Sequence, residues 1–434
     1  MEKKQGKLKA IIHNYFQDKK QEVKNYGKER LIKRLFTIFV TLILASLFIV
    51  LFAKTEYYKN DYTIALNEQN GTYAHLVKVK VNEITDIFYP PKEERRSYDV
   101  CITFSATILE GEDKGKVIEA KQYQNDYTKN YTRRIKAGQR VFVVKEEAGD
   151  FEPTYYFAGD SISYDHWGGI ILLASILVIL LLIVSKSKGL LTILSLGLTV
   201  LVIVFVLLPS ILVGRNIFIL TIVCAVYVIV VTFLLVVGVN KKCLCASLGC
   251  FFGLMLSGLL ALLTLRIMNA TGYYQQEDVE ELVMLFQTYY LAGIIIDLKG
   301  LLFASTIIGA LGAVMDVSLS LSSALKEVYD NSKETSLTST IKSGFTIGKD
   351  MIGTMVNTLV LAYIASDLTF ILWLMGHRST GFIFQSEYIA IAIAQALVGS
   401  IAMVLTIPLT SIVCAIIYNK KDKKEIDSNL VEEN

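Results

Sequence analysis

Histidine is scarce in this sequence, with four copies that lie far apart. They are His13, His75, His166 and His377, and none of them belongs to an HExxH metalloprotease motif. The chain also lacks a P-loop, a GxSxG nucleophile elbow and a dinucleotide-binding fingerprint. Hydrolysis of ATP is therefore not expected, and we predict that the protein is not an enzyme.

Cysteine is limited to six residues, and all but Cys101 lie in or beside apolar segments. The longest polar stretch therefore holds a single thiol and cannot form an internal disulfide. The chain also lacks a basic stripe with interleaved aromatic residues, so no nucleic-acid partner is expected. We interpret the close pair Cys243 and Cys245 as buried filling in a helix, because no histidine or carboxylate lies nearby in sequence.

The sequence is instead rich in apolar residues. Hydrophobic residues make up 53% of 434 positions and the mean hydropathy is +0.48, which exceeds what one globular core can bury. The lipid bilayer is therefore the expected partner. Eight segments are long enough to cross a hydrocarbon core of about 30 Å. They are Leu35–Ala53, Gly168–Ser185, Leu190–Leu212, Ile217–Val239, Cys243–Leu265, Leu301–Leu325, Met351–Met375 and Tyr388–Tyr418.

The distribution of lysines predicts how the chain is oriented in the membrane. They gather before the first segment, in alternate loops and after the last segment, so both termini are predicted to be cytoplasmic. The first segment is expected to be a retained signal anchor, since no small-residue cleavage site follows it. The predicted division is a basic cytoplasmic segment 1–34, an anchor 35–53, an extracytoplasmic domain 54–167, a seven-helix membrane domain 168–418 and a cytoplasmic tail 419–434.

The extracytoplasmic domain is predicted to be all-β. Apolar and polar residues alternate with period two in runs such as Val77–Val81 and Val100–Ile108. Five short strands at this spacing favour a small closed barrel, for which the OB fold is the candidate. A second polar region near 281–297 is too short and too charged for a regular span, and we predict a re-entrant or interfacial helix there.

The sixth segment carries Asp316 well inside its apolar run. A carboxylate at that depth costs several kcal/mol unless it is paired, hydrated or neutralised. Helical spacing places it on one stripe with small and hydroxyl residues, namely Gly309, Gly312, Ser320 and Ser323. Either this stripe binds a ligand, or it is a hydrogen-bonded seam that holds two helices together.

The seventh segment offers a matching face. Asp350, Thr354, Asn357 and Thr358 carry its oxygen atoms. The nearby glycines Gly344, Gly348 and Gly353 are predicted to let another helix approach and to weaken the start of this helix.

Carboxylate, hydroxyl and amide oxygens suit protons and hard cations better than zinc or copper. We therefore expect a transporter or permease for a cation or small polar solute, with its site between the sixth and seventh segments. One alternative is a non-transporting scaffold or sensor whose β domain binds an envelope partner. Another is an intramembrane hydrolase that pairs Asp316 with Asp350. The identity of any metal and the formation of a homo-oligomer stay open.

Two long strings resemble the YibE/F family of bacterial multipass membrane proteins. One runs from Ile308 to Ser318 and the other from Gly348 to Tyr363, and the stretch from Pro209 to Asn216 is similar to a further part of the family. The resemblance implies a protein of the bacterial plasma membrane. It implies no particular substrate or reaction.

Overall fold

The computed structural model describes ten stretches of the chain. They are residues 34–51, 72–91, 98–125, 133–148, 153–157, 163–164, 166–272, 295–332, 336–377 and 385–432. The chain divides into two compact units, one of Asn60–Val184 and one of Met1–Lys59 with Ser185–Asn434. The predicted re-entrant helix near 281–297 falls almost wholly outside the described residues.

Eight helices among the described residues are long and apolar enough to cross a membrane, as the sequence predicts. They are Arg34–Leu51, Trp167–Lys186, Lys188–Leu212, Ile217–Val236, Lys241–Ile267, Leu298–Asn331, Leu337–Gly376 and Glu387–Tyr418. The second and third belong to one continuous run, α4 (Trp167–Val202), η2 (Ile203–Leu207) and α5 (Leu208–Leu212). Lys186 interrupts α4 with a φ of 48°, so one run contains two separate spans.

Three of the remaining helices begin at polar caps. Asn216 accepts a hydrogen bond from the Ile219 amide at the start of α6 (Ile217–Val236), and Asn240 caps α7 (Lys241–Ile267) in the same way. Asp297 accepts from the amide of Gly300 at the start of α9 (Leu298–Asn331). These side chains satisfy amides that have no partner within the helix. The chain continues with α10 (Leu337–His377) and α12 (Glu387–Glu432).

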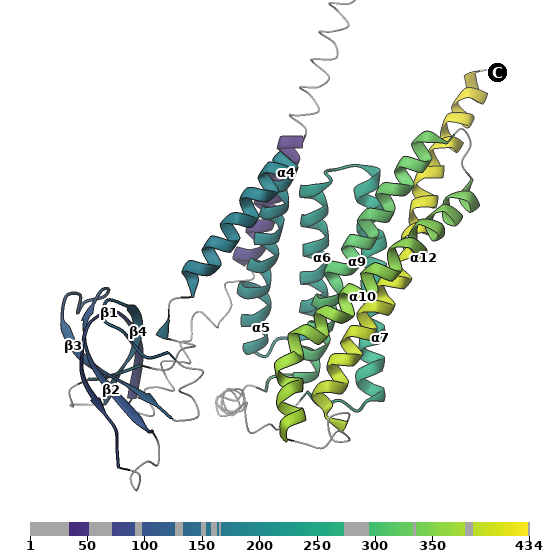
Figure 1. Ribbon diagram of the computed structural model, residues 1–434. Coiled ribbons are helices and arrows are strands. Elements are labelled where there is room, and N and C mark those ends of the chain that lie inside the picture. Colours follow the sequence, from purple (N-terminus) through teal and green to yellow (C-terminus); the bar gives the residue numbers. More distant parts are fainter. Residues whose placement is uncertain are drawn as a thin grey trace, which may run out of the picture. The chain divides into compact units, whose positions relative to one another are not determined.

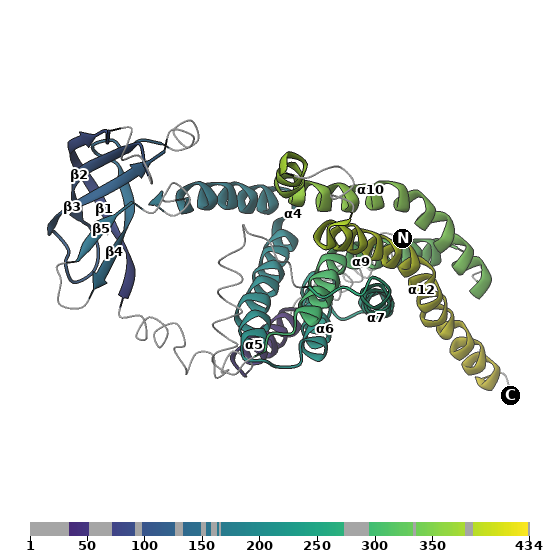
Figure 2. The ribbon, with the colours of Figure 1, turned by 90° about the horizontal axis from the view of Figure 1, so that it is seen from below.

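Helix α12 packs against α7, α9 and α10, and Figures 1 and 2 show these helices side by side. On α7, Gly249 faces Thr410 and Gly253 faces Thr406. A Cβ atom on Gly249 would lie 2.9 Å from the Thr410 Cβ and 3.1 Å from its Cα. Glycines four residues apart therefore let the backbones of α7 and α12 approach closely.

Helix α10 meets α12 through a second pair of glycines. Gly344 lies against Ser411, and Gly348 lies against Ile407. The Ser411 hydroxyl donates to the Ile407 carbonyl at 2.7 Å, so it needs no partner on α10. The glycines of α7 and α10 thus bring both helices onto the same two turns of α12.

The β unit contains five strands at the places where the sequence alternates (Figure 1). They are β1 (Thr72–Phe88), β2 (Val100–Ile108), β3 (Val117–Gln124), β4 (Arg140–Ala148) and β5 (Thr154–Tyr156). β1 pairs with both β2 and β4, β5 pairs with β4 and is parallel to β3, and the order β1-β2-β3-β5-β4 closes on itself. Inward-facing Val79, Val81, Ile102, Phe104 and Ala106 are buried in its core.

Replacement of Gly249 by alanine should destabilise the helical unit by about 1–3 kcal/mol, because the new methyl group meets the Thr410 backbone as well as its side chain. Thermal unfolding of the purified protein in detergent measures the change. The matched control is Gly197→Ala on α4, where a Cβ meets nothing within 4 Å. Equal unfolding temperatures for the two variants would contradict the close approach.

Cys101 is buried in the β unit, and this burial raises the pKa of its thiol, with Lys121 opposing the shift. Since the thiolate is the reactive form, alkylation of Cys101 should be slower in the folded protein than in urea. The folded rate should also keep rising above about pH 8.5, where the unfolded rate levels off. Mass spectrometry of the Cys101 peptide measures both rates, and coinciding pH profiles would refute the prediction.

Candidate functional site

The Asp316 stripe of α9 lies on the exposed face of that helix. Gly309, Gly312, Asp316 and Ser320 are all exposed, and Ser323 is half-buried. Asp316 comes 18 residues after the first residue of α9 and 15 before the last, which places it about 27 Å and about 22 Å from the two ends. Among the described residues, no hydrogen bond or ion pair engages its carboxylate.

Packed side chains flank this stripe on both sides. Met315 and Leu319 pack against the cluster that holds residues of the first helix and α6. Ala313 packs against the cluster that α7, α9 and α12 build. The exposed oxygens of α9 therefore lie between two packed edges.

The serines around Asp316 bond within their own helix. Ser323 donates to the Leu319 carbonyl at 2.6 Å. The buried Ser318 and Ser322 donate at 3.0 Å to the carbonyls of Met315 and Leu319. Each of these hydroxyls donates within its own helix, while the Ser322 carbonyl accepts a hydrogen bond from the Tyr418 hydroxyl of α12 at 3.2 Å and so joins α9 to that helix.

The polar residues of α10 are exposed as well. Thr354 and Thr358 donate to the carbonyls of Met351 and Thr354, at 3.2 and 2.8 Å, while Asp350 and Asn357 are exposed without a hydrogen bond among the described residues. The opposite face of α10 carries Gly344 and Gly348 onto α12.

The start of α10 lies earlier than the sequence suggests. The helix begins at Leu337, so Asp350 lies 13 residues inside it rather than at its end. A Cβ atom on Gly353 would meet nothing within 4 Å. In the described part of the chain, no hydrogen bond joins the oxygens of α10 to those of α9.

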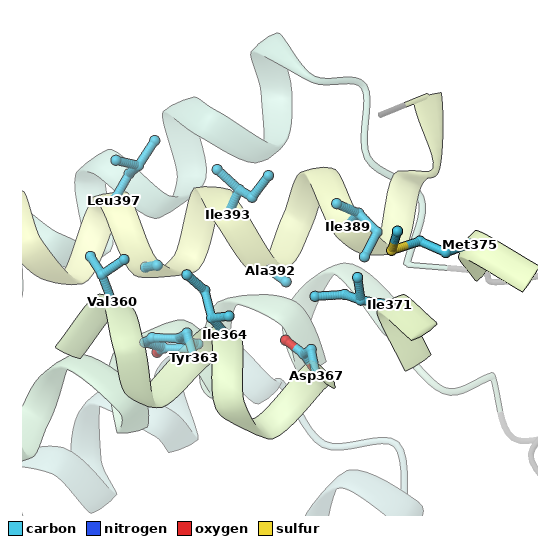
Figure 3. A pocket seen from close by; sticks show the side chains of 11 residues that line it. Val360, Tyr363, Ile364, Asp367, Ile371, Met375, Ile389, Ala392, Ile393 and Leu397 are labelled. Carbon is cyan, nitrogen blue, oxygen red and sulfur yellow. The ribbon is translucent and has the colours of Figure 1, made fainter. Parts of the chain in front are cut away.

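A groove of about 500 Å³ lies between α10 and α12, and sequence reasoning did not find it (Figure 3). From α10 it is lined by Val360, Tyr363, Ile364, Asp367, Ile371 and Met375. From α12 it is lined by Ile389, Ala392, Ile393, Ala396 and Leu397. Of the described residues that line it, Asp367 alone carries a charge. The surface of the groove is therefore almost wholly apolar, although one acidic residue contributes to its wall.

Asp367 is half-buried and hydrogen-bonded on one oxygen. The Tyr388 hydroxyl donates to Oδ1 at 2.7 Å, and the ring of Tyr388 packs on Phe370 with centroids 4.2 Å apart. No described residue donates to Oδ2. The sequence could have indicated Asp367, because this residue interrupts the predicted span Met351–Met375 just as Asp316 interrupts Leu301–Leu325.

Tyr363 connects this groove to the Asp316 stripe. Its ring lines the groove, and its hydroxyl lies against Gly309 of α9. That hydroxyl is buried without a hydrogen-bond partner among the described residues. Glycine at position 309 leaves the space that the hydroxyl occupies.

Two further contacts hold the start of α12. The Glu387 carboxylate accepts hydrogen bonds from the amides of Thr271 and Gly272, at 2.6 and 3.0 Å. Gln395 donates to the Ser305 hydroxyl of α9 at 2.7 Å.

Within the described residues, no group of three or more histidine, cysteine, aspartate or glutamate side chains is placed to hold a metal ion.

These features define a helical protein with eight potential membrane spans and a separate β unit. Residues 173–420 match the family described as YibE/F-like protein, and the chain belongs to that family, which confirms the resemblance seen in its sequence. The matched region begins within α4 and omits the β strands. No curated protein matches the chain, and no solved structure matches it. The family match and the eight apolar helices together indicate a membrane protein.

Replacement of Tyr388 by phenylalanine should destabilise the helical unit by about 1.5–3 kcal/mol, the usual range for a hydrogen bond to a charged group. The ring and its packing on Phe370 are kept, so only the hydroxyl is lost. Thermal unfolding in detergent measures the loss. The double variant with Asp367→Asn should lose less than the sum of the two single changes, and strict additivity would argue against the bond.

Proposed function

We propose that the protein is an integral membrane transporter or permease for a cation or small polar solute. It lies in the bacterial plasma membrane with both termini in the cytoplasm, as the lysine distribution indicates. Membership of the YibE/F-like family and the eight apolar helices support the membrane setting.

The observation that carries this proposal is the exposed, unpaired carboxylate of Asp316 near the midpoint of α9. Hydrocarbon would impose a penalty of several kcal/mol on such a group. Water or a polar solute must therefore reach it, and transport sites are typically built near the bilayer midplane. The two packed edges beside the stripe would form the walls of that path.

The chemistry of the exposed oxygens supports a hard cation or a proton as the transported species. Asp316 and Ser320 on α9, with Asp350, Thr354 and Asn357 on α10, offer carboxylate, hydroxyl and amide oxygens. We propose the cation as the transported substrate. An intramembrane hydrolase is less well supported, because no hydrogen bond links Asp316 and Asp350 among the described residues.

The five strands follow the closed order β1-β2-β3-β5-β4, with a parallel contact between β3 and β5, and this order supports the proposal of an OB-type barrel. We propose that it lies outside the cytoplasm and binds an envelope partner beside the transport activity. Phe88 and Tyr123 support this role, because their rings are 48% and 49% exposed and flank Cys101 across neighbouring strands. Exposed aromatic side chains are common at binding surfaces.

Asp316→Asn should preserve folding and abolish the response to the transported cation. A ligand present at about 100 times its dissociation constant stabilises the native state by about 2.7 kcal/mol. Thermal unfolding in detergent with H⁺, Na⁺, K⁺, Mg²⁺, Ca²⁺ and Mn²⁺ is therefore expected to reveal one stabilising cation for the unmodified protein only.

The matched control is Glu327→Gln, which removes an exposed carboxylate from the same helix. It should keep the full response to the cation. Uptake of that cation into liposomes should likewise be retained by the unmodified protein and Glu327→Gln and lost in Asp316→Asn. Identical unfolding of the unmodified protein and Asp316→Asn in every cation would remove the main support for the proposal.

A further inference from the structure

We infer that Cys245 of α7 and Cys414 of α12 are a thiol pair that a small hydroperoxide converts into a reversible disulfide joining the two helices. Both thiols are free in the structure, and both side chains are buried, with an exposed fraction of 0%. Neither residue belongs to the Asp316 stripe or to the polar face of α10. The disulfide would therefore form whether or not the protein transports ions.

The packing of α7 on α12 places the two cysteines opposite each other. Gly253 faces Thr406 and Gly249 faces Thr410, so the two helices run antiparallel. Each step of four residues back along α7 meets a step of four residues forward along α12. One further turn in this register pairs the two cysteines.

The helices are close enough at this point for a disulfide. A Cβ atom on Gly249 would lie 2.9 Å from the Thr410 Cβ, and one on Gly253 would lie 3.2 Å from the Thr406 Cβ. A disulfide needs Cβ atoms about 3.5–4.5 Å apart, so two such close turns bring the next pair within its range. A side-chain hydrogen bond already joins the two thiols, and both lie in the same packed cluster.

The surroundings favour a disulfide over a bound metal ion. The thiol pair packs among apolar side chains that include Leu321, Met403 and Ile407. Two thiolates holding a soft metal ion would place charge in this space, where it is costly. In the described part of the chain, no third histidine, cysteine or carboxylate joins the pair. A disulfide is neutral and apolar, so the same space accommodates it.

The oxidation is balanced with hydrogen peroxide as the hydroperoxide. One sulfur attacks the O–O bond and becomes a sulfenic acid, with release of one water. The second sulfur then displaces the hydroxyl group of the sulfenic acid, which forms the S–S bond and a second water. The two thiols lose two hydrogen atoms with their electrons, and the peroxide accepts them. Burial slows the first step, whereas contact between the two side chains speeds the second.

The pair lies near one end of both spans. Cys245 comes four residues after Lys241, the first residue of α7, and Cys414 comes four residues before Tyr418, where the last span ends. A small neutral peroxide therefore has about 6 Å of helix to pass. At the same end the Tyr418 hydroxyl bonds the Ser322 carbonyl of α9. The disulfide would add a covalent link where α12 already holds two helices.

The test uses purified full-length protein in detergent, which is reduced, treated with hydrogen peroxide, alkylated and digested with pepsin without reductant. Mass spectrometry with fragmentation should find a peptide that links Cys245 to Cys414, and dithiothreitol should remove the link. Oxidation should also raise the unfolding temperature of the unmodified protein, because a cross-link restricts the unfolded chain.

The link and the rise in unfolding temperature should both be lost in Cys414→Ser. The matched control is Cys243→Ser, which removes a buried thiol of the same helix that lies in a different cluster. This variant should keep the link and the rise.

The peptides of the unmodified protein decide the outcome even where a variant fails to fold. Thiols that stay free while glutathione in the same tube is fully oxidised would overturn the inference. Sulfinic acids on the two cysteines without a link would overturn it as well. A link that joins Cys243 to Cys245, or a link between positions 245 and 414 that appears only after the protein is unfolded, would have the same consequence.

Discussion

Close contact between backbones at α12 is the constraint on which the helical unit depends. Without glycine at positions 249 and 253 of α7, and at 344 and 348 of α10, neither helix would reach α12 at its observed separation. In a bilayer the hydrophobic effect contributes little to helix association, so close packing must supply the stabilisation. The glycines therefore determine which face of α10 turns inward.

The orientation of the helices explains where the polar side chains of α10 and α9 lie. Because Gly344 and Gly348 hold one side of α10 on α12, Asp350 and Asn357 must lie on the other side. In the same way the buried contacts of α9 leave Asp316 exposed between packed edges. On α10, helix packing and the placement of polar groups thus depend on the same two glycines, and a change in the packing would alter the placement.

The sequence predicted the large features well, because hydropathy and strand alternation are properties of single segments. Eight apolar helices and five strands appear where these patterns place them. It also identified Gly344 and Gly348 as contact residues but not that their partner is α12 rather than α9. Which helices become neighbours depends on residues far apart in the chain, and periodicity within one helix carries no such information.

The groove escaped prediction for the same reason. Its walls come from two helices, and apolar residues at helical spacing look alike whether they meet a neighbour or border a space. Asp367 was detectable as an interruption of an apolar run, yet its bond to Tyr388 depends on how α10 and α12 fold back on each other. Single residues can be found in this way, whereas their partners require the fold.

The side chain of Tyr363 contacts both the groove and helix α9. The phenol ring is rigid, so a molecule that tilts it in the groove also moves the hydroxyl that rests on Gly309. Such a tilt would couple the groove to the α9 surface at Gly309, two helical turns from Asp316, without any movement of the backbone. By thermodynamic reciprocity, a solute that displaces the hydroxyl from the α9 side would change affinity in the groove by the same factor.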